Sequence, residues 1–338
     1  MTRPCVQIDT ENQIGALRKH LESMLPHFTT FHGLVGLTLN GGLSRGYADH
    51  LSEIDLTFFL TPQGYESWQE GQTPIALGIT VLDGQLYDIK HLNYVTEKDR
   101  DWDEVTLWDA SYAEILYDPE NLLHELLAEK VGEGPDPAVA EGLLMNCWWH
   151  FELAGQIWIE RGDALQGHQM FNQAVVALVQ ALFVANREYI PHEKWLLHLS
   201  RSLEWRPPQW DRRLGAAMST GDLTIDSLRA RQGAIRALWE EVNEQIRARF
   251  YPQLPVYVMQ KSTYEELKIL AERESVSLEE WRARSGAEMP NSDPFHPLIT
   301  QKQGRISLDR AMLARIGPHE MYAWHYEVLQ AVAKEQKA

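Results

Sequence analysis

Two acidic side chains two positions apart, Glu53 and Asp55, have the spacing in this chain that most directly suggests chemistry. They stand at the start of an apolar run, residues 54–60, that is typical of a buried strand. Because side chains alternate along a strand, both carboxylates share the face opposite the apolar one. Carboxylates this close repel each other unless a cation lies between them or one keeps its proton. Since Mg²⁺ is bound by one or two carboxylates together with substrate phosphates, the pair suggests a metal site.

A glycine-rich segment precedes the acidic pair and follows a second apolar run, residues 34–39, that is also expected to be a strand. Gly41 and Gly42 open this segment. Glycine lets the backbone approach a ligand closely, and its N–H groups are then available to phosphate oxygens. The strands, the glycines and the acids together predict a metal-assisted nucleotide or polyphosphate site.

The same stretch resembles the signature of the nucleotidyltransferase superfamily related to DNA polymerase β. In that signature an apolar strand leads to Gly-Ser, a ten-residue loop often containing Ala-Arg-Gly, then Ser-Asp-x-Asp and another apolar strand. Here Gly41-Gly42 stands at the Gly-Ser position and ten residues separate it from Glu53-Ile54-Asp55. Ser44-Arg45-Gly46 matches Ala-Arg-Gly. The resemblance implies that Gly41, Gly42, Ser44 and Arg45 bind the triphosphate of ATP or another NTP, and that the acids hold Mg²⁺.

Two positions depart from the family pattern. Gly42 replaces a serine whose hydroxyl binds the triphosphate, and Glu53 replaces the first aspartate of the signature. These departures keep a second interpretation open, in which the chain is a catalytically impaired nucleotide-binding or protein-interaction member of the same fold.

A third acid follows on a predicted hairpin. The apolar runs 76–82 and 85–92 flank Asp83-Gly84, which is a strong hairpin signal. Asp88 and Lys90 share one face of the return strand, where a lone acid is most often simply exposed to solvent. The resemblance implies that Asp88 is the third carboxylate of the site, as a metal ligand or as the base toward an attacking hydroxyl. Asp83 is the rival for this role, but its position in the turn is better explained by structure. Lys90, two residues after Asp88, is a candidate phosphate contact, and a solvated lysine is the alternative.

The remaining periodicity predicts an α+β protein with two domains. Residues 1–132 are expected to form a nucleotidyltransferase-like domain, a mixed β-sheet flanked by helices, and residues 133–338 a helical substrate-binding bundle. Gly132-Glu133-Gly134-Pro135 is the expected linker. Helices are predicted over residues 10–25 (with a capping box at Thr10 and a stop at Pro26), 65–70, 120–130, 136–161, 163–187, from 191, and over 224–249, 264–273, 277–285 and 308–334.

Residues 181–196 resemble the helical substrate domain of uncharacterised nucleotidyltransferase-like proteins, themselves similar to aminoglycoside nucleotidyltransferases. In that architecture the helical domain faces the metal site across a cleft. The resemblance makes Lys194 a candidate phosphate contact from the opposite wall, and an exposed helix lysine without such a role is the alternative.

Charge and composition narrow the range of partners. The formal net charge is −17, which argues against a nucleic-acid backbone as a partner. Residues 97–141 contain 14 Asp or Glu against 3 Lys or Arg, which indicates either a solvated face or an acidic wall for a polyamine-like substrate. Cys5 and Cys147 are far apart, and no apolar run approaches 18 residues, so a cytoplasmic protein without a membrane segment is expected.

These observations together lead to the hypothesis that the protein transfers a nucleoside monophosphate from an NTP, most simply ATP, in an Mg²⁺-dependent reaction. Glu53, Asp55 and Asp88 are the expected metal ligands and catalytic acids. The acceptor is a hydroxyl of a small molecule, such as an aminoglycoside or lincosamide-like antibiotic, or of a protein. The sequence does not indicate an oligomeric state.

Overall fold

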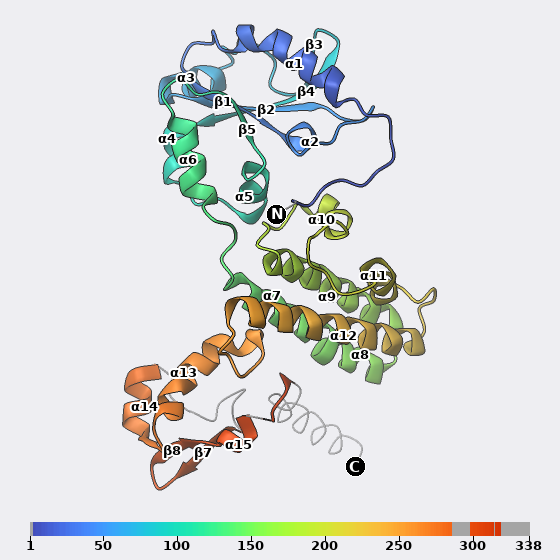
Figure 1. Ribbon diagram of the computed structural model, residues 1–338, viewed down its shortest axis with the longest axis vertical. Helices are drawn as coiled ribbons and strands as arrows, with labels where there is room; N and C mark the ends of the chain where they lie inside the picture. The colour runs from blue at the N-terminus through green and yellow to red at the C-terminus, as the bar shows by residue number, and fades with distance from the viewer. Residues whose placement is uncertain (1–2, 286–297, 314, 319–338) are drawn as a thin grey trace. The chain divides into compact units, whose positions relative to one another are not determined.

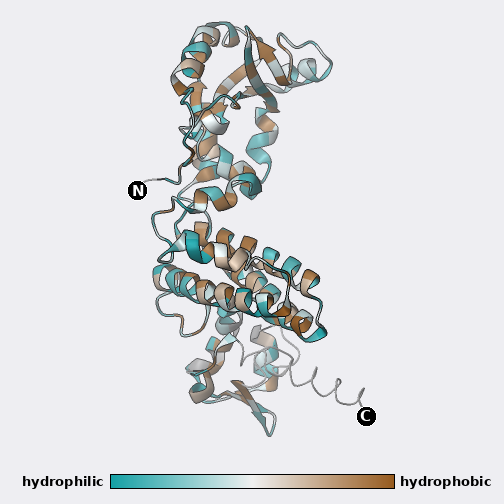
Figure 2. Cartoon of the chain, turned by 90° about the vertical axis from the view of Figure 1, so that its right-hand side faces the viewer, coloured by the Kyte–Doolittle hydropathy of each residue, from teal (hydrophilic) through white to brown (hydrophobic). Residues whose placement is uncertain are grey.

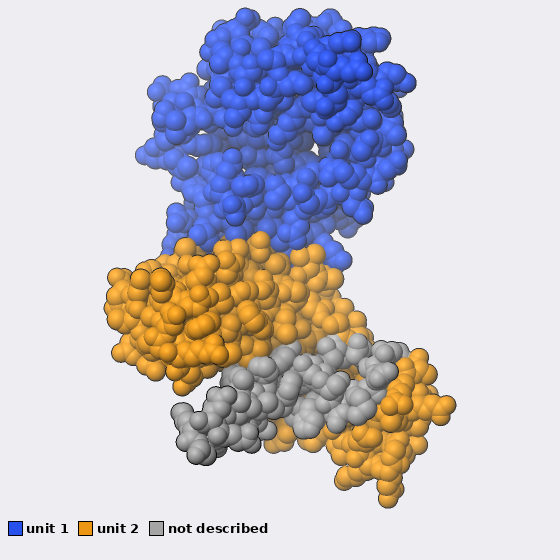
Figure 3. Space-filling model, turned by 180° about the vertical axis from the view of Figure 1, so that it is seen from behind, with its two compact units in different colours: residues 1–136, 182–211 blue, residues 137–181, 212–338 orange. Residues whose placement is uncertain are grey.

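The computed structural model describes residues 3–285, 298–313 and 315–318 (Figure 1). The chain divides into two compact units, each of which takes two separate stretches of sequence (Figure 3). The first unit contains residues 1–136 and 182–211, and the second contains residues 137–181 and 212–338. The division at residues 132 and 133 stays a prediction, and the return of 182–211 to the first unit was not foreseen.

The first unit is built on a mixed five-stranded sheet of order β3-β4-β2-β1-β5. β2 and β4 are parallel, and the other neighbouring strands are antiparallel. The strands are β1 (Leu34–Asn40), β2 (Ile54–Leu60), β3 (Gly78–Leu82), β4 (Gln85–Asn93) and β5 (Glu114–Tyr117). The predicted mixed sheet is present. The short strand β5 was missed because four half-buried residues give too little periodicity to recognise.

Seven helices of the described chain lie wholly within this unit. They are α1 (Ile14–Phe28), α2 (Gly41–Ser44), α3 (Pro62–Gln69), α4 (Tyr94–Asp99), α5 (Glu104–Ala110), α6 (Leu122–Val131) and α10 (Glu193–Ser200). α1 and α3 cover the apolar face of the sheet, and many residues of the strands are coloured as hydrophobic in Figure 2. The core between them is formed by Leu17, Leu21, Phe28, Leu37, Leu39, Ile54, Leu56, Phe58, Trp68, Tyr87 and Ile89. The opposite face of the sheet, on which α4, α5 and α6 lie, carries the polar residues discussed below.

Helix α1 differs from its predicted limits at both ends. It begins at Ile14, whose N–H donates to Asn12 Oδ1 over 2.9 Å, so Thr10 does not cap it as predicted. Pro26 lies inside the last turn instead of ending the helix. The helix continues because Phe28 is fully buried against the sheet, which outweighs one missing backbone hydrogen bond.

The second unit is helical in its first part and then contains a small sheet. Its helical elements are α7 (Val139–Trp148), a π-helix η1 (Trp149–Ala154), α8 (Gly155–Arg161), most of α9 (Ala164–Ala185), most of α11 (Trp210–Met218), α12 (Ile225–Phe250), η2 (Val258–Gln260), α13 (Lys261–Glu272), α14 (Leu278–Ser285) and α15 (Arg310–Leu313). β6 (Val276–Ser277), β7 (Ile299–Lys302) and β8 (Arg305–Leu308) form a sheet of order β6-β8-β7. A purely helical bundle is therefore not what the described residues form. Most of the helix predicted over 308–334 lies outside them.

One helix in the described part of the chain, α9, is long and apolar enough to span a membrane by length and composition. In its most apolar window 67% of the residues are buried inside the structure. Core helices of globular proteins pass the same test, so this feature is weak evidence for a membrane segment.

Candidate active site

The register of the sheet places the predicted acids side by side. Asn40 of β1 pairs with Asp55 of β2, and Asp55 pairs with Asp88 of β4. Neighbouring strands are about 4.8 Å apart, and Asp55 and Asp88 line the same cavity, so both carboxylates lie on one face. Glu53 lines the cavity as well, directly before β2. The sheet thus brings together the three acids that the sequence singled out.

A cavity of about 370 Å³ lies over this face of the sheet, and all of its lining belongs to the first unit. Three rows of the sheet form its floor. After the row of Asn40, Asp55 and Asp88 comes a row of Thr38, Thr57 and Lys90, and then the apolar pair Phe59 and Leu92. The other walls include Trp102, which precedes α5, and Val105, Trp108 and Asp109 within it. Leu127 of α6, and His192 and Lys194 at the start of α10, complete this part of the lining. The cavity therefore has an acidic end and an apolar end.

Gly41 is the residue that allows the chain to pass Asp55 closely. Its φ of +69° is unfavourable for other residues, and a Cβ there would lie 1.7 Å from Asp55 Oδ2. The predicted loop is a short helix, α2, which begins at this glycine. Gly41 and Arg45 line the cavity, whereas Gly42 and Ser44 are not among its lining residues.

Gly42 and Ser44, the other predicted phosphate contacts in α2, lie against atoms of the same loop. A Cβ on Gly42 would lie 2.9 Å from the carbonyl oxygen of Tyr47, so a serine at this position requires the loop to shift. Ser44 Oγ donates to the carbonyl of Gly41 over 3.1 Å. Their predicted contact with a triphosphate remains a prediction that depends on movement of this turn.

Arg45 is held by a residue that the sequence did not reveal. Its Nη1 donates to Asp109 Oδ1 over 2.8 Å, and its guanidinium carbon lies 4.4 Å from the ring centroid of Trp108. Asn40 Nδ2 donates to the other oxygen of Asp109 over 3.1 Å. Asp109 thus joins the arginine of the loop to the row of acids. One acid within an acidic helical segment carries no local signal, so only the folded arrangement identifies it.

Burial and the surrounding charges change the protonation of Asp55. Burial raises the pKa of the Asp55 carboxyl from 3.8 to about 6, and the negative charges of Glu53, Asp109 and Asp88 push it in the same direction. Arg45 acts in the opposite direction. Asp55 is therefore a site where a cation would be stabilised, because it would relieve both the repulsion and the cost of burying a charge.

Two lysines face the same cavity. Lys90 lies one row beyond Asp88 on β4, and Lys194 lies in the first turn of α10. Both side chains are exposed, and neither makes an ion pair within the described part of the chain. His192 caps α10, since its Nδ1 accepts from the N–H of Lys194 over 3.2 Å. Positive charge free to meet a phosphate thus comes from two different elements.

The acidic segment 97–141 supplies fewer free carboxylates than its composition suggests. Glu97 binds Arg100 at 2.7 Å and accepts from Trp102 Nε1, and Glu114 forms an ion pair with Arg18. Asp103 caps α5, and Asp118 accepts from His124. Much of this charge is therefore used inside the fold, which weakens the interpretation of the segment as an acidic wall for a polyamine.

The donor set suits a cation that also takes ligands from its substrate. Among the described residues, no group of three or more His, Cys, Asp or Glu side chains lies close enough to hold a metal ion by itself. Asp55 and Asp88 nevertheless offer two neighbouring carboxylates, and the pKa of the Asp55 carboxyl is raised by burial and by the negative charges around it. Mg²⁺ is commonly held by one or two carboxylates, waters and phosphates, so this pair fits it when a polyphosphate is present.

Part of the chain matches a known protein family, and one solved structure is similar to it. Residues 101–196, less than half of the chain, match a family model described as "Domain of unknown function (DUF4037)". A search of curated proteins found no match. The crystal structure of a nucleotidyltransferase-like protein from Exiguobacterium sibiricum 255-15 is similar, with a TM-score of 0.42 and 10% sequence identity over 86% of this chain and 99% of that one.

Proposed function

We propose that this protein transfers a nucleoside monophosphate from ATP or another NTP to an acceptor hydroxyl in an Mg²⁺-dependent reaction. The observation that carries the proposal is the register of β2 and β4, which sets Asp55 beside Asp88 at the acidic end of a cavity. Lys90 and Lys194 line the same cavity and supply positive charge for a polyphosphate. The close passage of Gly41 next to Asp55 brings the backbone to the same point.

The residues of the cavity divide the proposed reaction among them, and Asp88 has two roles in it. Asp55 and Asp88, with Glu53 beside them, would hold Mg²⁺, which would neutralise phosphate charge and help to align the α-phosphate with the acceptor. Lys90 and Lys194 bind phosphate oxygens. Asp88 accepts the proton of the acceptor hydroxyl. The acceptor oxygen forms its bond to the α-phosphorus while the bond from that phosphorus to the bridging oxygen breaks, and pyrophosphate leaves.

Transfer of label from α-³²P-ATP tests the proposal, with aminoglycosides, lincosamides and protein fractions offered as acceptors in the presence of Mg²⁺. We expect Asp55→Asn and Asp88→Asn each to reduce transfer at least about 100-fold, because both remove a metal ligand. Asp83→Asn is the matched control, since Asp83 is exposed in the β3–β4 turn and outside the cavity lining. Transfer that survives in both site variants would refute the assignment.

A second candidate, nucleotide binding without transfer, is favoured by the state of the loop. Arg45 is engaged by Asp109, and Gly42 has no hydroxyl to offer a phosphate. This alternative predicts that Mg²⁺-ATP binds, as measured by calorimetry, while no pyrophosphate appears with any acceptor. Pyrophosphate release that depends on an acceptor would exclude it.

A further inference from the structure

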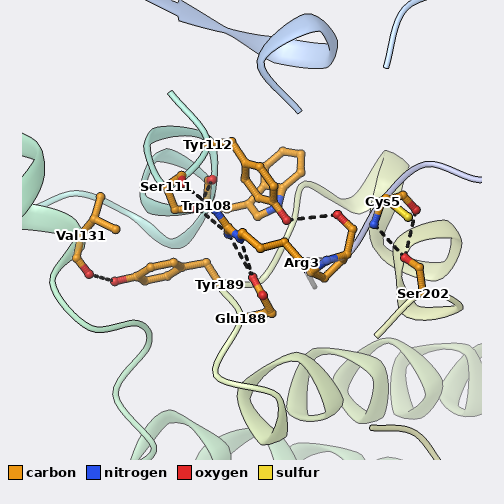
Figure 4. Close-up of polar contacts among 10 residues, drawn as sticks. Arg3, Cys5, Trp108, Ser111, Tyr112, Val131, Glu188, Tyr189 and Ser202 are labelled. Carbon is orange, nitrogen blue, oxygen red and sulfur yellow. Dashed lines mark hydrogen bonds and ion pairs between the residues drawn. The ribbon is translucent and has the colours of Figure 1, made fainter. Parts of the chain in front are cut away.

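Arg3 lies outside the cavity but connects two of its walls (Figure 4). Its Nη1 donates to the carbonyl oxygen of Ser111 over 2.6 Å, and its Nη2 donates to Ser111 Oγ over 3.0 Å. Nε and Nη2 of the same guanidinium donate to Glu188 Oε2 over 3.3 and 3.0 Å. One side chain thus bridges positions that are 77 residues apart in the sequence, 111 and 188.

The bridge is tightly packed. The guanidinium carbon of Arg3 lies 3.5 Å from the centroid of the Tyr112 ring, and the Tyr112 hydroxyl donates to the carbonyl of Pro4 over 3.3 Å. The Glu188 side chain is only 15% exposed, so its charge depends on this arginine for compensation. A planar guanidinium that stacks on a ring and bonds on two edges is a use of arginine that lysine cannot reproduce.

Each end of the bridge leads directly to residues of the cavity. Ser111 follows α5, whose Trp108 and Asp109 hold Arg45. Glu188 precedes α10, which carries Lys194 into the cavity. Fixing Ser111 and Glu188 to one another therefore fixes the α5 wall relative to the α10 wall.

Cys5 and Gln7 form hydrogen bonds at the C-terminal end of α10. Cys5 N–H donates to Ser202 Oγ over 2.9 Å, and Ser202 Oγ lies 2.9 Å from the Cys5 carbonyl, to which it can donate. Gln7 N–H donates to Nε2 of His198 over 2.9 Å. Residues 3–7 are therefore bound to residues before α10, within it and after it. The chain itself reaches α10 only by way of residues 137–181, which belong to the second unit.

We propose that residues 3–7 act as a strap and that Arg3 is a positioning residue, which holds α10 against the cavity and thereby places Lys194 at the polyphosphate. The part that concerns Lys194 rests on the proposed function. The strap itself does not rest on the proposed function, because its loss is expected to make α10 less ordered whether or not a ligand is bound.

Hydrogen exchange of the full chain tests the strap without any ligand. In Arg3→Met, we expect amides of residues 188–200 to exchange at least about tenfold faster, because tenfold corresponds to the loss of a single charge-assisted hydrogen bond. The amides of β2 are expected to keep their rates. Glu188→Gln serves as the second variant should Arg3→Met fold poorly, and Arg201→Gln is the control, since Arg201 pairs only loosely with Asp211 at 3.5 Å. Unchanged exchange in both Arg3→Met and Glu188→Gln would overturn the proposal.

Nucleotide affinity tests the link to Lys194. Calorimetry with Mg²⁺ and a non-hydrolysable ATP analogue is expected to show about tenfold weaker binding for both Arg3→Met and Lys194→Gln. The double variant Arg3→Met/Lys194→Gln is expected to bind the analogue no more weakly than Lys194→Gln does, because Arg3 affects binding through Lys194. Multiplied effects in the double variant would overturn the link, and so would an undiminished affinity of Arg3→Met. A wild-type chain that binds no analogue would refute the proposed function, while the exchange result would still decide the strap.

Discussion

Asp55→Asn is expected to stabilise the protein at neutral pH even as it removes function. The pKa of this carboxyl rises from 3.8 to about 6 in the folded chain, so folding favours its protonated form. The difference of about 2 units corresponds to about 3 kcal/mol, since one unit is about 1.4 kcal/mol. This cost to stability is absent below pH 4, grows as the pH rises from about 4 to about 6, and is complete above that range.

The variant should therefore gain up to about 3 kcal/mol over wild type at pH 7.5 and almost nothing at pH 4. Asn has the shape of Asp, so the close contact with Gly41 is retained. Hydrogen exchange of β2 amides, measured across this pH range under conditions where it reports opening of this unit, gives the free-energy difference. Asp83→Asn is the control and should show no pH-dependent gain. A gain of equal size at pH 4 and pH 7.5, or none at either pH, would refute the reasoning.

Three further predictions concern neighbouring residues. Gly41→Ala should destabilise the first unit by more than about 2 kcal/mol in chemical denaturation, because its Cβ would meet the Asp55 carboxylate at 1.7 Å. Gly46→Ala, also at positive φ but with nothing within 4 Å of the added Cβ, should cost only about 1 kcal/mol. Asp109→Asn should lower the pKa of Asp55, as measured by NMR of its carboxyl group, because one of the repelling charges is removed. An unchanged or higher pKa would contradict this. Lys90→Gln should weaken Mg²⁺-ATP binding about tenfold at low salt and flatten its salt dependence, and an unaltered salt dependence would show that Lys90 does not meet the phosphates.

The local features of the site could be predicted because they depend on few residues. The alternation from Glu53 to Leu60 places acids on one face and core residues on the other, and the structure has this arrangement. Asp83 and Gly84 have φ of 46° and 82°, as the hairpin signal requires. The helix predicted to end at residue 161 does end there, because α8 stops at Arg161 and Gly162 follows it with φ of 74°.

The parts that sequence reasoning missed depend on contacts between distant segments. Asp109 becomes part of the site only because it accepts hydrogen bonds from Arg45 at the end of α2 and from Asn40 of β1, and no spacing in the sequence predicts this. The return of residues 182–211 to the first unit is held by pairs such as Arg3 with Glu188, which are 185 positions apart. The loop pattern also did not show that Gly42 and Ser44 lie outside the cavity lining, because it did not predict the helical turn of α2.

The most direct test of the account is electron paramagnetic resonance of Mn²⁺, used in place of Mg²⁺, with a non-hydrolysable ATP analogue. We predict that Mn²⁺ binds the wild-type protein only when the nucleotide is present. Asp55→Asn and Asp88→Asn should each weaken this binding, whereas Asp83→Asn should not. Nucleotide-dependent binding of Mn²⁺ that persists in the double variant Asp55→Asn/Asp88→Asn would contradict it, as would a wild-type protein that binds no Mn²⁺ with the nucleotide.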